Sequence, residues 1–365
     1  MQSIAFIKEI FPNFTTKFKQ MTNQSEITIH DIARKLNISA STVSRALNNN
    51  QLISKTTRDK IKKVAREMGY RPNTMAANLR TRRTNTIGVI VPLINRHFFS
   101  SVISGIEEVA YKEGFAVTIS QSNDNFEKEE KIAQTLFSNR VDGLIISIGM
   151  ETIHFDHLKH FSKRNVPLVF FDRIVDEIDG HKISVDDYRG GFKATSHLIE
   201  QGAKRIAHIG GPLNLNIYQK RLDGYHDAME KAGLPVDVSM LLHNSLTRAD
   251  GTNAVKKLFS QKEKPDAIFC ANDTTALSAI MYFNENGIKV PEDVLIVGFS
   301  NEPFSEVVTP SISTIRQPGF EMGQKAAELI IEQIKLKDKP AKFQKIVMPT
   351  ELLVRQSSVK RKINS

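Results

Sequence analysis

From residue 86 onward the sequence alternates between short apolar runs and amphipathic segments, and this repeat restricts the fold more than any other feature. The runs predict strands, and the segments between them show the apolar spacing of helices. We expect strands at 86–92, 115–121, 143–148, 167–172, 205–209, 240–243, 267–271 and 294–299. We expect helices at 98–113, 126–139, 155–164, 187–201, 218–232, 249–259, 274–286 and 320–336. Two series of this kind predict an α/β fold with two doubly wound parallel sheets.

Length and composition exclude several classes of protein. A chain of 365 residues is expected to form two or three domains. Its single cysteine, Cys270, excludes an internal disulfide and a cysteine-rich metal site, and it indicates a reducing compartment. No apolar run approaches the roughly 20 residues of a membrane span, so we expect a soluble, cytoplasmic protein with no membrane partner.

The excess positive charge lies at one end of the chain. Residues 1–85 contain 16 Lys and Arg against 5 Asp and Glu, whereas residues 86–365 contain 34 against 35. Such asymmetry indicates that the first segment meets a polyanion. A basic arm that only improves solubility remains the alternative on charge alone.

Residues 27–71 have the pattern of three short helices. Thr28 and Asp31 are typical of a helix start, and a helix of about nine residues follows. After a three-residue turn, Ser39 can cap a second helix at 40–48, and a third is expected at 55–68. The first two helices form a helix-turn-helix, whose second helix would enter the major groove of DNA. The bare pattern also occurs in proteins that never bind DNA.

Four spaced motifs make the pattern more specific. They are Asp31-Ile32-Ala33, Ser41-Thr42-Val43-Ser44-Arg45-Ala46-Leu47-Asn48, Gly69-Tyr70-x-Pro72-Asn73 and Ala76-x-x-Leu79. With these motifs the chain resembles the LacI/GalR family of bacterial transcription regulators. The resemblance implies a helix-turn-helix headpiece at 27–71, a hinge helix and linker at 72–85, and a two-lobed, periplasmic-binding-protein-like core at 86–355. It also implies that the helix 320–336 returns to the first lobe and the closing segment 343–355 to the second, which makes three crossovers between the lobes. Residues 1–26, in which Met21 is an alternative start to Met1, and the polar basic tail 356–365 receive no function.

The resemblance also implies roles in DNA binding. Ala40 and Ser41 occupy the positions that choose between operators, and Arg45 is expected to reach a guanine. Leu79 matches the apolar wedge that enters the minor groove, although a contact with the core is the alternative. The implied DNA-binding residues are Thr28, Ala40, Ser41, Thr42, Ser44, Arg45, Asn48, Asn73, Ala76 and Leu79.

Polar and aromatic side chains follow the expected strands, where ligands bind in sheets of this kind. In the family the matched positions bind an effector between the lobes. They are Asn95, Phe98, Ser147, Asp172, Arg173, Arg221, Asn272, Asp273 and Ser300. Asp172 and Asp273 could instead cap helices. Ser300 departs from the pattern, because many relatives carry an aspartate there that holds sugar hydroxyls. The loss of that carboxylate favours a sugar acid over a neutral hexose.

An enzyme is not expected, because the nucleotide-binding, hydrolase and zinc-protease motifs are absent. His154, His157 and His160 are interpreted as a solvated face and not a metal site, and Cys270 as a packing residue. No cofactor is expected. The alternative function is a sugar-binding protein of a transport or signalling system, which would not need residues 27–79.

The family resemblance implies a mechanism. A homodimer would bind a pseudo-palindromic operator in double-stranded DNA with two headpieces, acting as a repressor. A small effector, a sugar or sugar acid, would change the angle between the lobes and thereby the operator affinity. The tail lacks heptads, so no coiled-coil tetramer is expected. Whether the effector induces or co-represses stays open.

Overall fold

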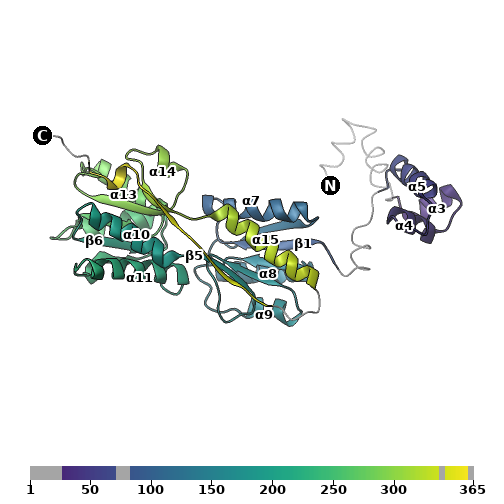
Figure 1. Cartoon of the computed structure of the whole chain (residues 1–365), viewed down its shortest axis with the longest axis horizontal. Helices are drawn as coiled ribbons and strands as arrows, with labels where there is room; N and C mark the ends of the chain where they lie inside the picture. The colour runs from purple at the N-terminus through teal and green to yellow at the C-terminus, as the bar shows by residue number, and fades with distance from the viewer. Residues whose placement is uncertain (1–26, 71–82, 337–341, 361–365) are drawn as a thin grey trace, which may run out of the picture. The chain divides into compact units, whose positions relative to one another are not determined.

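The computed structural model describes residues 27–70, 83–336 and 342–360 (Figure 1). The chain separates into two compact units, Met1–Arg82 and Arg83–Ser365. Among the described helices, none has the length and apolar character needed to cross a membrane. The predicted hinge helix, with Asn73, Ala76 and Leu79, lies outside the described residues, as does the segment 1–26.

The first unit contains the three predicted helices, α3 (Ile29–Leu36), α4 (Ala40–Leu47) and α5 (Lys55–Glu67). Ser39 caps α4, because its side chain accepts a hydrogen bond of 3.1 Å from the Thr42 N–H. The three helices bury a small shared core. Its fully buried members are Ile32, Ala33, Val43, Ala46, Ile61 and Ala65.

The second unit contains two six-stranded sheets, one in each of two lobes. The first lobe has the order β11-β5-β4-β3-β1-β2, with every pair parallel. Its strands are β1 (Thr86–Val91), β2 (Ala116–Gln121), β3 (Gly143–Ile146), β4 (Leu168–Phe171), β5 (His181–Val185) and β11 (Lys345–Met348). The predicted doubly wound sheet is therefore confirmed for this lobe.

The second lobe repeats the arrangement in the order β12-β10-β9-β8-β6-β7, with only the edge strand β12 antiparallel. Its strands are β6 (Ile206–Gly210), β7 (Leu241–His243), β8 (Ala267–Cys270), β9 (Leu295–Ser300), β10 (Ser313–Arg316) and β12 (Glu351–Leu353). Two 3₁₀ turns, η1 (Val238–Met240) and η2 (Gln356–Ser358), flank these strands.

Helices cover both faces of each sheet (Figure 1). The first lobe carries α7 (His97–Lys112), α8 (Phe126–Ser138), α9 (Asp156–Lys163) and α15 (Gly319–Leu336). The second carries α10 (Asp187–Glu200), α11 (Asn216–Lys231), α12 (Arg248–Phe259), α13 (Asp273–Glu285) and the short α14 (Phe304–Val307).

Close helix contacts depend on glycine in both lobes. A Cβ atom at Gly105 of α7 would lie 2.1 Å from the Phe320 carbonyl oxygen of α15, and one at Gly323 would lie 2.0 Å from that of Val102. In the second lobe a Cβ atom at Gly224 of α11 would lie 2.1 Å from the Tyr188 carbonyl oxygen of α10. These backbones approach too closely for any side chain, so the helix pairs are fixed against each other.

The chain passes between the lobes three times, as predicted: from β5 to α10, from β10 to α15, and from β11 to β12. The expectation that the whole closing segment 343–355 joins the second lobe is wrong in part. Its first half, β11, pairs with β5 in the first lobe, and only β12 pairs with β10 in the second. The segment is long enough to supply an edge strand to each sheet, with Pro349 and Thr350 between them.

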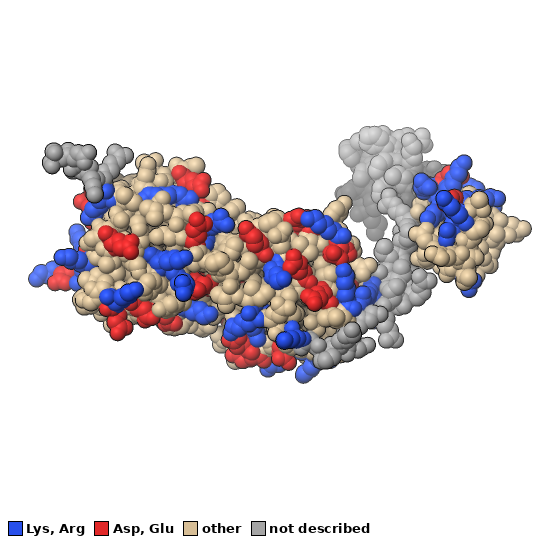
Figure 2. All heavy atoms as spheres, in the orientation of Figure 1, with Lys and Arg blue, Asp and Glu red and all other residues tan. Residues whose placement is uncertain are grey.

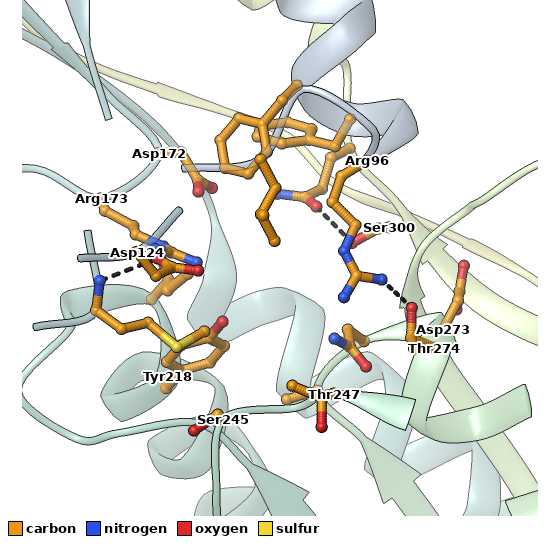
Figure 3. Close-up of a pocket in the computed structure, with 18 of the residues that line it drawn as sticks. Arg96, Asp124, Asp172, Arg173, Tyr218, Ser245, Thr247, Asp273, Thr274 and Ser300 are labelled. Atoms are coloured by element: carbon orange, nitrogen blue, oxygen red, sulfur yellow. Dashed lines mark hydrogen bonds and ion pairs between the residues drawn. The ribbon is translucent and has the colours of Figure 1, made fainter. Parts of the chain in front are cut away.

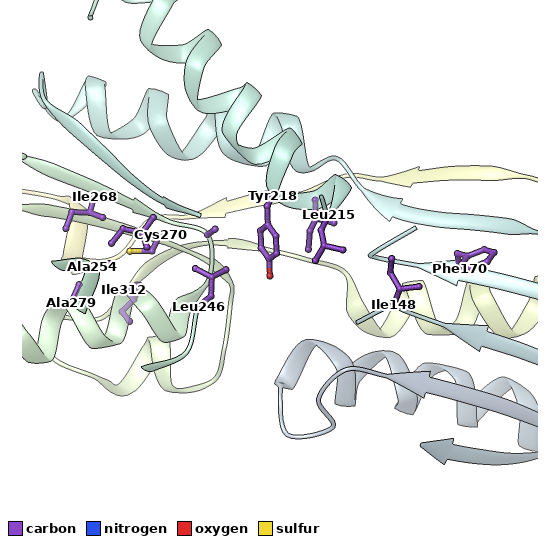
Figure 4. Close-up of a cluster of buried hydrophobic side chains, with 14 of the residues drawn as sticks. Ile148, Phe170, Leu215, Tyr218, Leu246, Ala254, Ile268, Cys270, Ala279 and Ile312 are labelled. Atoms are coloured by element: carbon purple, nitrogen blue, oxygen red, sulfur yellow. The ribbon is translucent and has the colours of Figure 1, made fainter. Parts of the chain in front are cut away.

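An apolar cluster connects the two lobes (Figure 4). Leu215 and Tyr218 at the start of α11 lie between Phe170 of the first sheet and Ile268 of the second. Cys270 is fully buried in this cluster, which agrees with its predicted packing role.

Candidate functional site

The second helix of the headpiece carries six of the side chains predicted to meet DNA, counting its C-cap residue. Ser41 and Arg45 on α4 and the C-cap Asn48 are exposed, while Ala40, Thr42 and Ser44 are half-buried. Thr28 is also exposed, and its hydroxyl donates a 2.7 Å hydrogen bond to Asp31. Val43 and Ala46 face the core, so the polar face of α4 is left free for a partner.

The surface charge differs between the two units. Figure 2 shows Lys and Arg side chains gathered on one side of the headpiece, whereas both signs alternate over the core. The exposed lysines and arginines of α5 are Lys55, Lys60, Lys63 and Arg66. A surface of this kind attracts the phosphates of nucleic acid.

A cavity of about 390 Å³ opens between the lobes, close to the carboxyl ends of both sheets (Figure 3). Seven of the nine predicted effector residues line it: Phe98, Asp172, Arg173, Arg221, Asn272, Asp273 and Ser300. Asn95 and Ser147 do not line it. Asn95 is exposed on the loop before α7, where its neighbour Arg96 faces the cavity instead, and Ser147 is buried one residue after β3.

One wall of the cavity is built from Asp124, Asp172 and Arg173 of the first lobe (Figure 3). Arg173 forms an ion pair with Asp124 and donates a 3.2 Å hydrogen bond to the Ile148 carbonyl. Asp172 is only 4% exposed, yet its Oδ1 atom accepts no hydrogen bond from the described residues. Burial raises the pKa of Asp172, and the charges of Arg173 and Arg221 and the side chain of Gln317 oppose that rise. A ligand hydroxyl would satisfy this oxygen.

Arg221 lies in the second turn of α11, because the helix begins at Asn216 and not at 218 as predicted. Its guanidinium pairs with the Asp187 carboxylate at 2.8 Å, donates to the Ala271 carbonyl at 2.7 Å, and lies 3.6 Å from the centroid of the Phe299 ring. Burial raises the pKa of Asp187 to about 7, and Arg221 holds it down. Arg221 is therefore largely satisfied inside the protein, so it builds the wall and has little capacity left for an acidic ligand.

Asn272 and Asp273 begin α13 in the second lobe. Asn272 is the N-cap residue, since its side chain accepts a 2.8 Å hydrogen bond from the Thr275 N–H. Asp273 is the first helical residue, and its carboxylate accepts from the Thr314 hydroxyl and the Glu302 N–H, each at 2.7 Å. Burial raises the pKa of Asp273 to about 7, against these two hydrogen bonds. Neither Asp172 nor Asp273 is the N-cap of a described helix.

Hydrogen bonds cross the rim of the cavity from one lobe to the other. Arg96 at the start of α7 donates to the Thr274 hydroxyl of α13. The Glu302 carboxylate of the second lobe accepts from the His97 N–H at 3.2 Å. Elsewhere on the rim, the Asn216 side chain accepts from the Ile174 N–H at 3.1 Å. The two lobes are thus held together by bonds that a change in their angle would break.

The sequence interpretation did not include several lining residues. Arg96, Asp124, Tyr218, Thr247 and Gln317 are among them. The rule that ligand groups follow strands would have found Asp124 after β2 and Thr247 after β7. Gln317 follows β10, a strand that was not predicted, and Tyr218 was assigned only to a helix.

The interpretation of the three histidines as a solvated face is wrong for His157. This side chain is fully buried, and its Nε2 lies 3.0 Å from a carboxylate oxygen of Glu129, which is buried as well. Sequence spacing alone does not show that α9 turns this residue toward α8. In the part of the chain that the structure describes, no group of three or more His, Cys, Asp or Glu residues is arranged to hold a metal ion.

Together these features define a class of protein. A basic headpiece exposes a polar helix suited to the major groove, and a separate two-lobed unit encloses a cavity with an unsatisfied carboxylate and aromatic side chains. This combination is that of a DNA-binding regulator that responds to a small molecule.

Comparisons with known proteins agree. Residues 28–73 match the family of bacterial regulatory proteins, lacI family, and residues 195–358 match a periplasmic binding protein-like domain. The HTH-type transcriptional repressor CytR of Escherichia coli (strain K12) is 33% identical over 316 residues, 87% of this chain and 92% of the relative. The HTH-type transcriptional regulator DegA of Bacillus subtilis (strain 168) is 36% identical over 332 residues, 91% and 98% of the two chains.

Solved structures are similar as well. The complex of the transcriptional regulator CelR with cellobiose has a TM-score of 0.69 and 27% identity, covering 91% of this chain and all of that one. The lac repressor dimer bound to operator and an anti-inducer, with a TM-score of 0.81 and 24% identity over 92% of this chain and all of that one, shares the fold. The chain belongs to the lacI family of bacterial regulatory proteins, and it is a DNA-binding transcriptional regulator with an effector-binding core.

Proposed function

We propose that the protein acts as a homodimeric repressor that binds a pseudo-palindromic operator and changes its affinity when a sugar-like effector fills the cavity. The DNA contacts are proposed for the exposed face of α4. Arg45 donates to a guanine, Ala40 and Ser41 discriminate among base pairs, and Thr42 and Ser44 contact phosphates. Exposure of Arg45 on a helix whose other face is buried supports this assignment.

The proposed effector is a small polyhydroxylated molecule. Carboxylate and amide groups accept from and donate to hydroxyls, while Phe98 and Tyr218 offer apolar faces for a ring. The similar CelR structure is a complex with cellobiose, a neutral sugar. The observation that carries the proposal is the buried Asp172 Oδ1 atom, which lines the cavity and accepts no hydrogen bond from the described residues.

Replacing Asp172 with asparagine tests the effector site. A hydrogen bond to a charged group contributes about 1.5–3 kcal/mol, so we expect effector affinity to fall roughly 10- to 150-fold. The free energy of unfolding should stay the same or increase, because a buried carboxylate with a raised pKa is replaced by a neutral group of the same shape. Calorimetry and urea denaturation measure the two quantities. Unchanged effector affinity in a folded variant would remove Asp172 from the site.

The coupling between the two units is proposed to pass through the angle between the lobes. The rim bonds from Arg96 and His97 of the first lobe to the second hold one angle, and a ligand that contacts both lobes favours a particular one. A coupling free energy of about 1–3 kcal/mol would change operator affinity roughly 5- to 150-fold.

Leu79 is proposed as the apolar wedge of the hinge, on the family resemblance of the motif that contains it. We expect Leu79→Ala to weaken operator binding far more than binding to random duplex, because the bend that the wedge stabilises brings more protein onto specific DNA only. Fluorescence anisotropy on both duplexes measures the two losses. Equal losses would contradict the role, and unchanged binding would favour the alternative contact with the core.

A further inference from the structure

The first helix of the first lobe, α7, begins at the cavity without a capping side chain of its own. Its N-cap residue is Arg96, whose side chain makes no cap hydrogen bond and has no acceptor atom with which to make one. By contrast, α8, α12 and α13 begin after residues whose side chains accept from the first turn, namely Asn125, Thr247 and Asn272. The backbone N–H groups at the start of α7 therefore need an acceptor from elsewhere.

That acceptor comes from the other lobe. Glu302 follows β9 in the second lobe, and both of its carboxylate oxygens accept from the His97 N–H, the first of α7, at 3.2 and 3.3 Å. The Glu302 side chain is only 9% exposed, and within the described ranges it has no hydrogen-bond partner besides His97. The dipole of α7, a helix of 16 residues, also favours a carboxylate at this end. Glu302 thus caps α7 only while the lobes keep the angle seen in the structure.

The loop that carries Glu302 is fixed within the second lobe. The Glu302 N–H donates to the Asp273 carboxylate at 2.7 Å, and the Asn301 N–H donates to the Thr314 hydroxyl oxygen at 3.2 Å. Arg355 donates to the Asn301 side chain at 2.8 Å. A change in the lobe angle therefore moves the Glu302 carboxylate away from α7, because the loop is held in place. Asp273 also lines the cavity, so the same wall that a ligand would contact holds the cap (Figure 3).

We infer that Glu302 is a positioning residue that holds the lobes closed, because it supplies from one lobe the helix cap that α7 of the other lobe lacks. The closed arrangement is the one in the structure, with the cap formed. The neighbouring contact, from Arg96 to the Thr274 hydroxyl, adds a hydrogen bond between the lobes but no cap for α7. This inference rests on the proposed function, because it assigns the contact that sets the angle through which the cavity acts on DNA binding.

The test measures the distance between the lobes in the full-length protein without any ligand. Lys163→Cys in the first lobe and Val238→Cys in the second place spin labels at exposed positions, while the native Cys270 is fully buried and protected from the label. Labelled protein is diluted with unlabelled protein, so that double electron–electron resonance reports the distance within one chain. In Glu302→Ala we expect the ratio of open to closed chains to rise about 2- to 30-fold, the usual effect of removing a helix cap.

Three further variants separate capping from other effects. Glu306→Ala is the matched control, because this glutamate of the same loop pairs with Arg355 inside the second lobe, and it should leave the distance unchanged. Glu302→Gln keeps an acceptor for the His97 N–H but loses the charge, so its shift should be smaller than that of Glu302→Ala. Arg96→Ser gives α7 a capping residue of its own, so in that background Glu302→Ala should shift the distance less.

Three results would overturn the inference: an unchanged distance in Glu302→Ala, a shift that Glu306→Ala reproduces, or a Glu302→Ala shift of the same size in the Arg96→Ser background. Circular dichroism shows whether each variant is folded. If Glu302→Ala is not folded, an unchanged distance in the isosteric Glu302→Gln overturns the inference.

Operator affinity of the same ligand-free variants is measured separately. A distance that shifts in Glu302→Ala while operator affinity stays the same contradicts the proposed coupling of the lobe angle to DNA binding, and it leaves the capping role of Glu302 intact. An operator affinity that changes while the distance does not contradicts the capping role and leaves the proposed function intact.

Discussion

Arg45→Ala is expected to lower the affinity of the proposed dimer for its operator by about 2–6 kcal/mol, because each of its two headpieces would lose a guanine contact worth about 1–3 kcal/mol. Affinity for random duplex should fall much less, since only one positive charge per headpiece is removed. The effector affinity and the unfolding transition should not change, because Arg45 is exposed and lies in the other compact unit from the cavity.

The operator for this measurement comes from selection of bound sequences out of random duplex, followed by anisotropy titrations. Arg66→Ala is the matched control, because this exposed arginine lies in the last turn of α5 and not on α4. It should weaken operator and random duplex by the same factor. If Arg45→Ala also weakens binding to operator and to random duplex by the same factor, Arg45 contacts phosphate and not a base.

Arg221→Ala is expected to destabilise the core by about 3–5 kcal/mol, because it leaves the buried Asp187 carboxylate without its partner. The two side chains are only 4% and 0% exposed, so water cannot replace the lost contact. The loss in the free energy of unfolding should grow as the pH rises from 6 to 9. Without Arg221 the pKa of Asp187 rises further above its unfolded value, so at high pH the folded state must hold an unpaired charge and at low pH it binds a proton instead.

Urea denaturation across this pH range measures the effect. The double variant Arg221→Met with Asp187→Leu is the control, because an apolar pair of similar volume removes the unpaired charge and should recover most of the stability. A single-variant loss below about 1 kcal/mol, or a loss that shrinks as the pH rises, would contradict the buried ion pair. Reduced effector affinity in Arg221→Ala would report this instability, so Asp172→Asn is the better test of the site.

The repeat of strands and helices was enough to predict both sheets, because buried parallel strands are continuous apolar runs. Four strands were not predicted: β5, β10, and the two edge strands β11 and β12 of the closing segment. β5 begins His181-Lys182, and β10 reads Ser313-Thr314-Ile315-Arg316, so neither has an uninterrupted apolar run. Partners in the sheet, and not local sequence, determine these strands. Because sheet partners determine such strands, the sequence did not show that β11, the first half of the closing segment, pairs in the first lobe.

The cavity was predictable in outline, since residues after strands in both lobes line it. The ion pairs that hold its charged side chains were not predictable. Arg221 meets Asp187 from a neighbouring helix 34 residues away, and nothing in their local sequence indicates that contact. In the same way, the ion pair between Arg173 and Asp124 joins residues that lie far apart in the sequence.

We propose that one ligand in the cavity changes how tightly the headpieces hold operator DNA. The most direct measurement titrates the full-length protein onto its selected operator at one fixed salt concentration, with and without a ligand that calorimetry places in the cavity. We expect a 5- to 150-fold change in operator affinity, and in Asp172→Asn the change should require a correspondingly higher ligand concentration. An operator affinity that stays the same when the cavity is saturated would contradict the account.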